Sequence, residues 1–225
     1  MKFTPNEPRK STDAGFEHRT PYRRRNKIIV SLIVIAAIFA LLATWGVRVY
    51  NKLVASQEAM QQSVGNVQNA YQRRADLIPN IVAAVKSYAE YEQSTLQAVT
   101  EARAKASSTT IDANNITASQ LEAFQAAQAQ MSSALSRLLV TVEKYPDLKA
   151  STNYLDLQSK LESCENSISN ARMEFNKAAK AYNTLLRRFP NNIIAGLYNF
   201  EKIPYFEAIT EGAEVALNVG EMFEN

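Results

Sequence analysis

Twenty consecutive uncharged residues near the N-terminus constrain this chain more than any other feature. The run is IIVSLIVIAAIFALLATWGV, from Ile28 to Val47. As an α-helix it would be about 30 Å long, which matches the hydrocarbon core of a bilayer. A cleaved signal peptide has a shorter apolar region and a small-residue cleavage site, and a buried core helix has a polar face; the run shows neither pattern. The sequence therefore predicts a transmembrane helix at residues 28–47.

Basic residues are concentrated before this run. Residues 1–27 contain eight lysines and arginines against three acidic residues, whereas the rest of the chain has a net charge of −2. The tail is polar and rich in proline, so we expect residues 1–27 to be a disordered basic tail. Because more basic residues precede the run than follow it, the positive-inside rule places the N-terminus in the cytoplasm and residues 48–225 outside it. The near-neutral body argues against nucleic-acid binding.

The remainder of the chain has the composition and periodicity of long α-helices. The 225 residues include only 6 glycines and 7 prolines. Apolar residues recur at steps of three and four in four stretches, which span residues 50–78, 81–102, 121–145 and 154–189. Turn-rich segments at 107–117 and 145–152 separate the later stretches, with Thr117 and Ser151 as expected helix N-caps.

The segment YQRRADLIPNIV, residues 71–82, interrupts this pattern. Pro79 lacks an N–H and disfavours helical geometry at Ile78, while Asp76 could cap a new helix. A sharp reversal at Asp76–Pro79 is one interpretation. A single kinked helix is the other, because the apolar spacing continues through this point without a slip.

Several long segments resemble the LemA family of bacterial membrane-anchored proteins. They include YQRRADLIPNIVAAVKSYAEYE, LSRLLVTVEKYPDLKAS and YLDLQSKLESCENSISNARMEFNKAAKAYNTLLRRFPNNIIAGLYNF, and the resemblance extends from Tyr50 to Ala208. It implies a helical bundle of up-and-down type behind one N-terminal transmembrane segment, and so favours the reversal at residues 76–79. Two positions depart from the family pattern: Val64 stands where many members have Trp, and Tyr91 where many have His.

The predicted architecture is therefore all-α, with an N-terminal transmembrane helix followed by an up-and-down four-helix bundle. After the tail and the membrane helix, we expect the bundle at residues 48–189 and an aromatic C-terminal extension at 190–225. Cys164 lies on the last apolar stripe and is expected to be a small buried side chain.

The sequence predicts no catalytic, cofactor-binding or metal-binding residues. The one histidine, His18, lies in the basic tail, and no cluster of His, Cys and carboxylate residues has metal-ligand spacing. Neither a glycine-rich phosphate loop nor a histidine base is available, so a Ser–Lys pairing is the remaining hydrolytic arrangement. We expect a protein without a cofactor that is not an enzyme.

Polar residues on the apolar stripes are the candidates for a binding site or for fixing helix register. The intruding residues are Gln57, Arg74, Glu92 and Gln128. Buried polar groups of this kind must be paired, and such pairs can specify which helices face each other. Alternatively, guanidinium groups near the proposed reversal could bind a carboxylate or phosphate of a partner. The candidate set is Arg73, Arg74, Asp76, Pro79, Asn80 and Glu92.

Aromatic residues near the membrane helix and near the C-terminus are candidates for the membrane interface, where such rings are favoured. They are Trp45, Tyr50, Tyr198, Phe200, Tyr205 and Phe206.

The function that we expect is a membrane-anchored scaffold or adaptor that binds other envelope proteins. It would be a single-pass protein of the bacterial cytoplasmic (inner) membrane, in contact with the lipid bilayer through residues 28–47. Candidate partners are other envelope proteins and a second copy of the chain, with no nucleic acid. The alternative is a membrane-shaping or lipid-contacting protein, and an unrecognised hydrolase is a third, weaker hypothesis.

Overall fold

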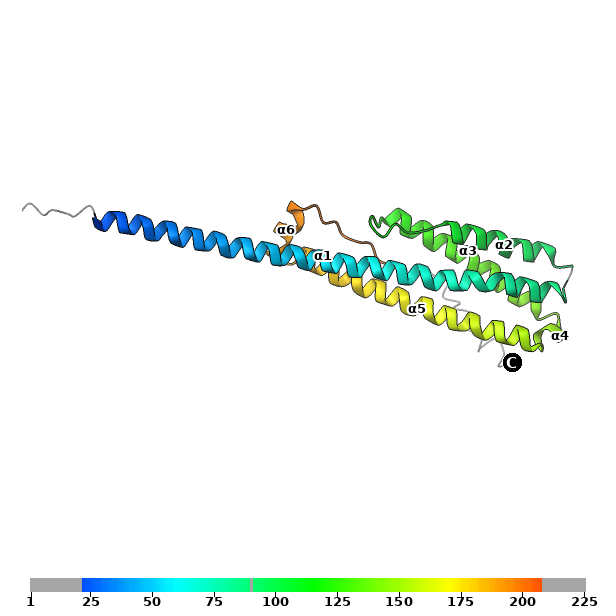
Figure 1. Ribbon diagram of the computed structural model, residues 1–225. Coiled ribbons are helices and arrows are strands. Elements are labelled where there is room, and N and C mark those ends of the chain that lie inside the picture. Colours follow the sequence, from blue (N-terminus) through cyan, green and yellow to red (C-terminus); the bar gives the residue numbers. More distant parts are fainter. Residues whose placement is uncertain (1–21, 90, 208–225) are drawn as a thin grey trace, which may run out of the picture. The chain divides into compact units, whose positions relative to one another are not determined.

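The computed structural model describes residues 22–89 and 91–207, and within them every regular element is an α-helix (Figure 1). The all-α prediction is confirmed for this part of the chain. Contacts between Cα atoms divide the protein into two units, residues Met1–Val47 and Arg48–Asn225. The first unit contains the N-terminal apolar segment, and the second contains the later part of the first helix and all the other helices.

Helix α1 (Tyr22–Lys86) begins in the first unit. Its large apolar side chains between Ile28 and Leu42 are about half exposed or more, on every face of the helix. Among the described residues, α1 is the one helix long and apolar enough to cross a membrane. Because α1 starts at Tyr22, residues 22–27 are helical, unlike the disorder predicted for them; the rest of the predicted tail lies outside the described residues.

Helix α1 does not reverse at Asp76–Pro79, so that prediction is wrong and the alternative of one helix is correct. A proline inside a helix leaves the carbonyl four residues earlier without its usual donor. Here that carbonyl belongs to Ala75, and Arg103 supplies the missing donor: its Nε donates to the Ala75 oxygen at 2.8 Å. The side chain of a later helix thus replaces the backbone hydrogen bond that Pro79 removes.

The chain turns after Lys86 instead. Helix α2 (Gln93–Ser108) follows, so the helix predicted from residues 81–102 is divided between α1 and α2. The other helices are α3 (Ala118–Val142), α4 (Pro146–Lys149), α5 (Thr152–Arg187) and α6 (Asn191–Leu197).

Two predicted N-caps are confirmed. The hydroxyl of Thr117 accepts from the backbone N–H of Gln120 at 3.2 Å, and that of Ser151 accepts from Tyr154 at 3.3 Å. These side chains satisfy backbone donors that the first turns of α3 and α5 leave unpaired. The beginnings of both helices are therefore encoded locally.

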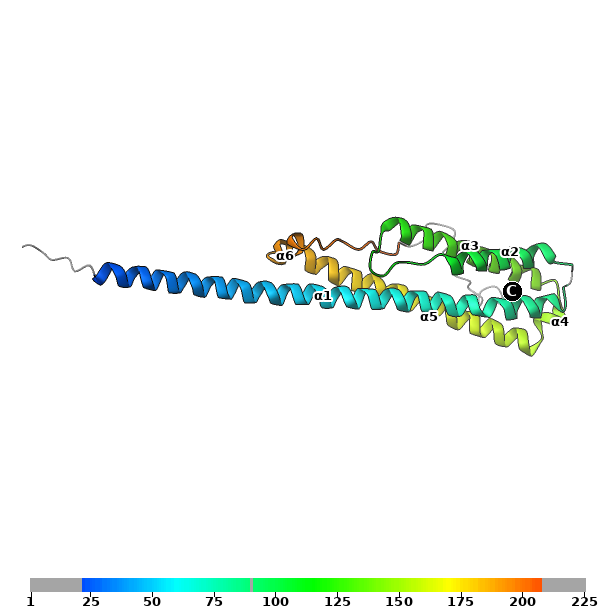
Figure 2. The same ribbon diagram turned by 45° about the horizontal axis from the view of Figure 1, so that its top comes forward.

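The second unit contains two apolar clusters, arranged along the length of the helices. In both views the later part of α1 lies beside α5, and α2 lies beside α3 (Figures 1 and 2). The first cluster combines residues of α1, α2, α3, α4 and α5, including Ile78, Val85, Val99, Leu135, Leu148 and Leu161. The second is formed mainly by α1, α3 and α5, and includes Met60, Val64, Tyr71, Phe124, Ile168 and Phe175. Cys164 is half-buried on α5.

Candidate binding site

Arg74 lies inside the second unit, with a relative exposure of 2%. Its Nη1 donates to Ser132 Oγ at 2.9 Å and to Glu165 Oε1 at 2.8 Å, and its Nη2 donates to Gln128 Oε1 at 2.9 Å. Gln128 Nε2 in turn donates to the carbonyl of Ala106 at 3.3 Å. This network joins α1, α2, α3 and α5. Its members bind one another, as a register-fixing group would, and that role stays a prediction.

One nitrogen of the guanidinium, Arg74 Nε, has no hydrogen-bond partner among the described residues. The group lies over the ring of Tyr71, with Cζ 5.2 Å from the ring centroid. Sequence reasoning did not identify Ser132 or Glu165, because neither interrupts an apolar stripe.

The remaining candidates of this group do not form one site with Arg74. Arg73, Asp76, Pro79 and Asn80 are exposed on α1, and Asp76 accepts a hydrogen bond from Gln72 Nε2 at 2.7 Å. Arg73 and Asp76 are therefore surface residues, whereas Arg74 faces the core.

Glu92 lies at the other end of the turn that joins α1 to α2. Its Oε1 accepts from the hydroxyl of Tyr145 at 3.4 Å. Desolvation, with the Glu92 carboxylate adding to it, raises the pKa of the Tyr145 phenol above its usual value.

A segment without regular structure follows α6 and runs back along α5; residues 199–207 are called here the C-terminal strap. Two asparagines of α5 hold it. The side-chain amide of Asn183 donates to the carbonyl of Ile203 at 2.8 Å and accepts from its N–H at 3.0 Å. Asn176 pairs in the same way with Phe206, at 2.9 and 2.8 Å. Each amide thus binds both backbone groups of one residue, as a neighbouring extended chain would.

The aromatic candidates divide between the surface and the core. The ring centroids of Tyr198 and Phe200 lie 4.7 and 5.9 Å from that of Tyr50. Phe206, by contrast, is 4% exposed, and its centroid lies 4.7 Å from that of Phe175, so its ring belongs to the core. Tyr205 is exposed.

Trp45 lies on α1 in the first unit. Membrane contact by it and by the exposed rings of the second unit stays a prediction.

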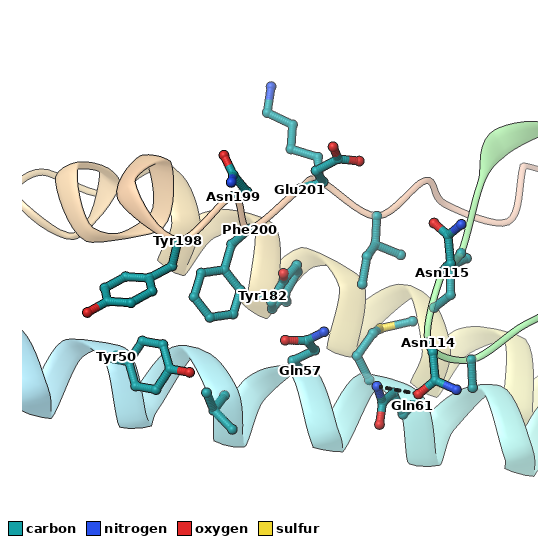
Figure 3. A pocket seen from close by; sticks show the side chains of 16 residues that line it. Tyr50, Gln57, Gln61, Asn114, Asn115, Tyr182, Tyr198, Asn199, Phe200 and Glu201 are labelled. Carbon is teal, nitrogen blue, oxygen red and sulfur yellow. Dashed lines mark hydrogen bonds between the residues drawn. The ribbon is translucent and has the colours of Figure 1, made fainter.

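A pocket of about 400 Å³ opens between the strap, α1, α5 and the loop that joins α2 to α3 (Figure 3). The side chains of Gln57 and Tyr182 point into the space between α1 and the strap. Asn114 and Asn115 border it from the loop, and Glu201 points away from α1. Sequence reasoning missed this pocket because three of its walls come from segments far apart in the chain.

Side-chain amides on one face of α1 hold the loop that borders the pocket. Gln68 Nε2 donates to the carbonyl of Ile111 at 2.9 Å, and Gln61 Nε2 donates to Asn114 Oδ1 at 3.3 Å. Gln57 lies on the same face, one helical turn before Gln61. Its side chain makes no hydrogen bond within the described part of the chain, so its donor and acceptor face the pocket.

The pocket also contains a phenol. Burial raises the pKa of Tyr182, and the negative charge of Glu201 adds to the shift. The Tyr182 hydroxyl is therefore protonated at neutral pH and can donate a hydrogen bond. Among residues 22–89 and 91–207, no group of three His, Cys, Asp or Glu side chains could hold a metal ion. The arrangement suits recognition of a polar ligand by amides and aromatic rings.

The part of the chain that the structure describes is thus helical apart from its turns and loops, and its one long apolar helix is that of a membrane-associated protein. The sequence profile of the LemA family matches residues 63–220, and the chain belongs to that family. The resemblance seen in the sequence is therefore confirmed.

The chain is similar to three named proteins in particular. It is 26% identical over 211 residues to the magnetosome protein MamQ 1 of Paramagnetospirillum magneticum, covering 84% of this chain and 76% of that protein. Over 205 residues it is 25% identical to magnetosome protein MamQ of Magnetospirillum gryphiswaldense, covering 82% and 75% of the two chains. It is also 27% identical over 158 residues to protein LemA of Metamycoplasma hominis, covering 70% and 68%.

Proposed function

We propose that this protein is a membrane-anchored adaptor whose helical bundle binds an extended segment of another envelope protein. The observation that carries this proposal is the amide of Gln57 in the pocket, which no described residue pairs with, on a face of α1 whose other amides hold backbone or loop groups. The later part of α1, together with α2, α3 and α5, would form the up-and-down four-helix bundle. In this role the protein binds and positions partners and is not an enzyme.

A peptide suits the chemistry of the pocket. Each peptide residue presents one backbone donor and one acceptor, and a glutamine amide can satisfy both. The strap shows that the bundle already recognises backbone in this way through Asn176 and Asn183. The volume of about 400 Å³ falls within the range of binding pockets, which is roughly 300–1,000 Å³. The ring of Phe200 offers an apolar contact for a partner side chain.

The proposed location is the bacterial inner membrane, with the N-terminus in the cytoplasm and the bundle outside it. The excess of basic residues before the apolar run supports this orientation. A partner in the pocket would then be a periplasmic or membrane protein, or a second copy of this chain.

Photo-crosslinking in intact cells tests the proposal. A benzoylphenylalanine replaces Asn115, an exposed residue on the rim of the pocket, in the full-length protein. We expect a discrete protein adduct whose crosslinked peptide can be identified by mass spectrometry, and we expect Gln57→Trp to abolish it by filling the pocket.

The matched control places the same crosslinker at Gln97, which is exposed on α2 and outside the pocket. Identical adducts at both positions, adducts that survive Gln57→Trp, or adducts with lipid alone would each contradict the adaptor proposal. An adduct with the chain itself would identify the partner as a second copy.

The alternative function, lipid contact, requires an exposed apolar surface near the membrane anchor. Helix α6 provides such a surface.

A further inference from the structure

Helix α6 and Phe189, two residues before it, expose large apolar side chains. Phe189, Ile193 and Leu197 are 77%, 58% and 71% exposed. Ile193 and Leu197, four residues apart, lie along one side of α6, and Phe189 lies in the turn that leads into the helix. Ala195 is buried on the opposite side, which packs α6 onto the protein. Large apolar side chains gathered on one exposed face commonly mark a binding surface.

The contacts of α6 place it near the start of the second unit. Tyr198 directly follows α6, and its ring centroid lies 4.7 Å from that of Tyr50. Tyr50 comes three residues after Val47, the end of the apolar run. Three residues span at most about 11 Å, whatever the orientation of the two units. When residues 28–47 cross a bilayer, α6 is consequently close to its surface.

The charges around this face are mainly positive. Arg187 and Arg188 directly precede Phe189 and are exposed, as is Arg48 at the start of the second unit. Basic residues beside an apolar helix face are typical of segments that lie on membranes containing anionic lipid. The adjacent strap contributes two exposed acidic residues, Glu201 and Glu207, and one exposed basic residue, Lys202.

We propose that α6 is an interfacial anchor: Phe189, Ile193 and Leu197 enter the headgroup region of the same bilayer that residues 28–47 cross. The exposed apolar face, the short tether from Val47 to Tyr50 and the adjacent arginines favour a lipid surface over a protein partner. The proposal does not depend on peptide binding, because the pocket faces the space between α1 and the strap. A second contact with the bilayer would limit the tilting of the bundle on its single membrane helix.

Fluorescence quenching by lipids in proteoliposomes tests this anchor. The full-length protein, with Cys164→Ser and Ile193→Cys, carries a bimane label at position 193. It is reconstituted into vesicles of phosphatidylcholine and phosphatidylglycerol, with or without nitroxide groups near the lipid headgroups. We expect the nitroxide lipids to reduce the fluorescence roughly twofold or more, as for a side chain inserted at the interface.

A label at Leu155 provides the matched control. Leu155 is 50% exposed near the start of α5, 32 residues before Arg187, which corresponds to about 48 Å along the helix. We expect little quenching there. Equal quenching at positions 155 and 193 would mean that the bundle adsorbs to lipid without orientation, and would overturn the proposal.

A second variant tests the apolar face itself. Leu197→Glu places a charge on an exposed position, so circular dichroism should show an unchanged helical fold. We expect it to remove most of the quenching at position 193. Undiminished quenching in Leu197→Glu would refute the interfacial anchor, as would an unquenched label at position 193 in the parent protein. A photo-crosslinker at position 193 that captures a protein in place of lipid would likewise overturn the proposal and identify α6 as a protein-docking surface.

Discussion

Arg74 and Gln57 interrupt the same apolar stripe of α1, yet their surroundings differ. Arg74 is buried among polar partners from other helices, and its charge is neutralised by Glu165 at 2.8 Å. Gln57 faces an open pocket and makes no hydrogen bond within the described part of the chain. A polar residue on an apolar stripe therefore has no fixed meaning. Whether it stabilises the fold or is free to bind a ligand depends on what the distant segments place opposite it.

The comparison predicts the largest loss of stability at Glu165. Glu165→Ala leaves the guanidinium of Arg74 almost fully buried without its counter-charge, so the free energy of unfolding should fall by about 3–5 kcal/mol. Urea unfolding of the full-length protein in detergent, followed by circular dichroism, measures the change. Glu162→Ala, at an exposed position on the same helix, should stay within about 0.5 kcal/mol of the parent. Similar values for both variants would show that the ion pair between buried Arg74 and half-buried Glu165 does not stabilise the fold.

A substitution of Arg103 tests whether the helical backbone of α1 near Arg74 is also stabilised by a side chain distant in the sequence. Arg103→Met removes the donor to the Ala75 carbonyl, and we expect a loss of about 1–3 kcal/mol. Pro79→Ala restores the N–H that normally binds this carbonyl, so Arg103→Met should cost less in that background. A double-mutant cycle measures the coupling, and strictly additive effects would argue against the replacement of one donor by the other.

Gln57→Leu should have a much smaller effect on stability, within about 0.5 kcal/mol, because the amide makes no hydrogen bond to the described residues. The same change should strongly reduce the crosslink from position 115, since a leucine cannot pair with a peptide backbone. Unfolding and crosslinking are measured on one preparation. A large loss of stability with an unchanged crosslink would mean that Gln57 stabilises the fold, as Arg74 does, and does not bind the partner.

The smallest expected effect is on the titration of Tyr182. The negative charge of Glu201 contributes to the raised pKa of this phenol, so Glu201→Gln should lower the pKa toward its usual value. Ultraviolet difference spectra above about pH 10 measure the ionisation, with Tyr182→Phe identifying the signal. Because the folded pKa is raised, the related stability is present below the unfolded pKa and is lost as the pH rises through the folded value. An unchanged titration would show that Glu201 does not act on the pocket.

Local signals in the sequence predicted much of the fold. The stripe from Tyr154 to Phe189 corresponds closely to α5, and Thr117 and Ser151 cap helices as expected. These features depend on neighbouring residues, so the sequence contains the information directly. The apolar run also predicted the helix that is suitable for a membrane span.

The features that sequence reasoning missed depend on contacts between distant residues. Pro79 suggested a chain reversal because the loss of its N–H can be seen in the sequence. The replacement donor comes from Arg103 in α2, 28 positions after the Ala75 carbonyl that it binds, and this contact cannot be seen in the sequence. The pocket likewise requires the strap to lie along α5, and Asn176 and Asn183 have no local signature as backbone-binding residues. The sequence shows that the two asparagines are seven residues apart, but it does not show which segment of the chain they bind.

That spacing has a consequence for how the chain can change in length. Asn176 and Asn183 are separated by two turns of α5, about 10.5 Å, while their partners Phe206 and Ile203 are three residues apart. Three residues in a polyproline II conformation complete one turn of about 9 Å and present the same side again, and Pro204 favours that conformation. The two spacings are therefore nearly equal in length, and each asparagine meets the backbone of one strap residue. One residue inserted or deleted between Asn176 and Asn183 would turn one asparagine away from the strap. One inserted or deleted between Ile203 and Phe206 would shift one backbone partner away from its asparagine. We therefore expect α5 and the strap to change in length together, with α5 changing by whole helical turns.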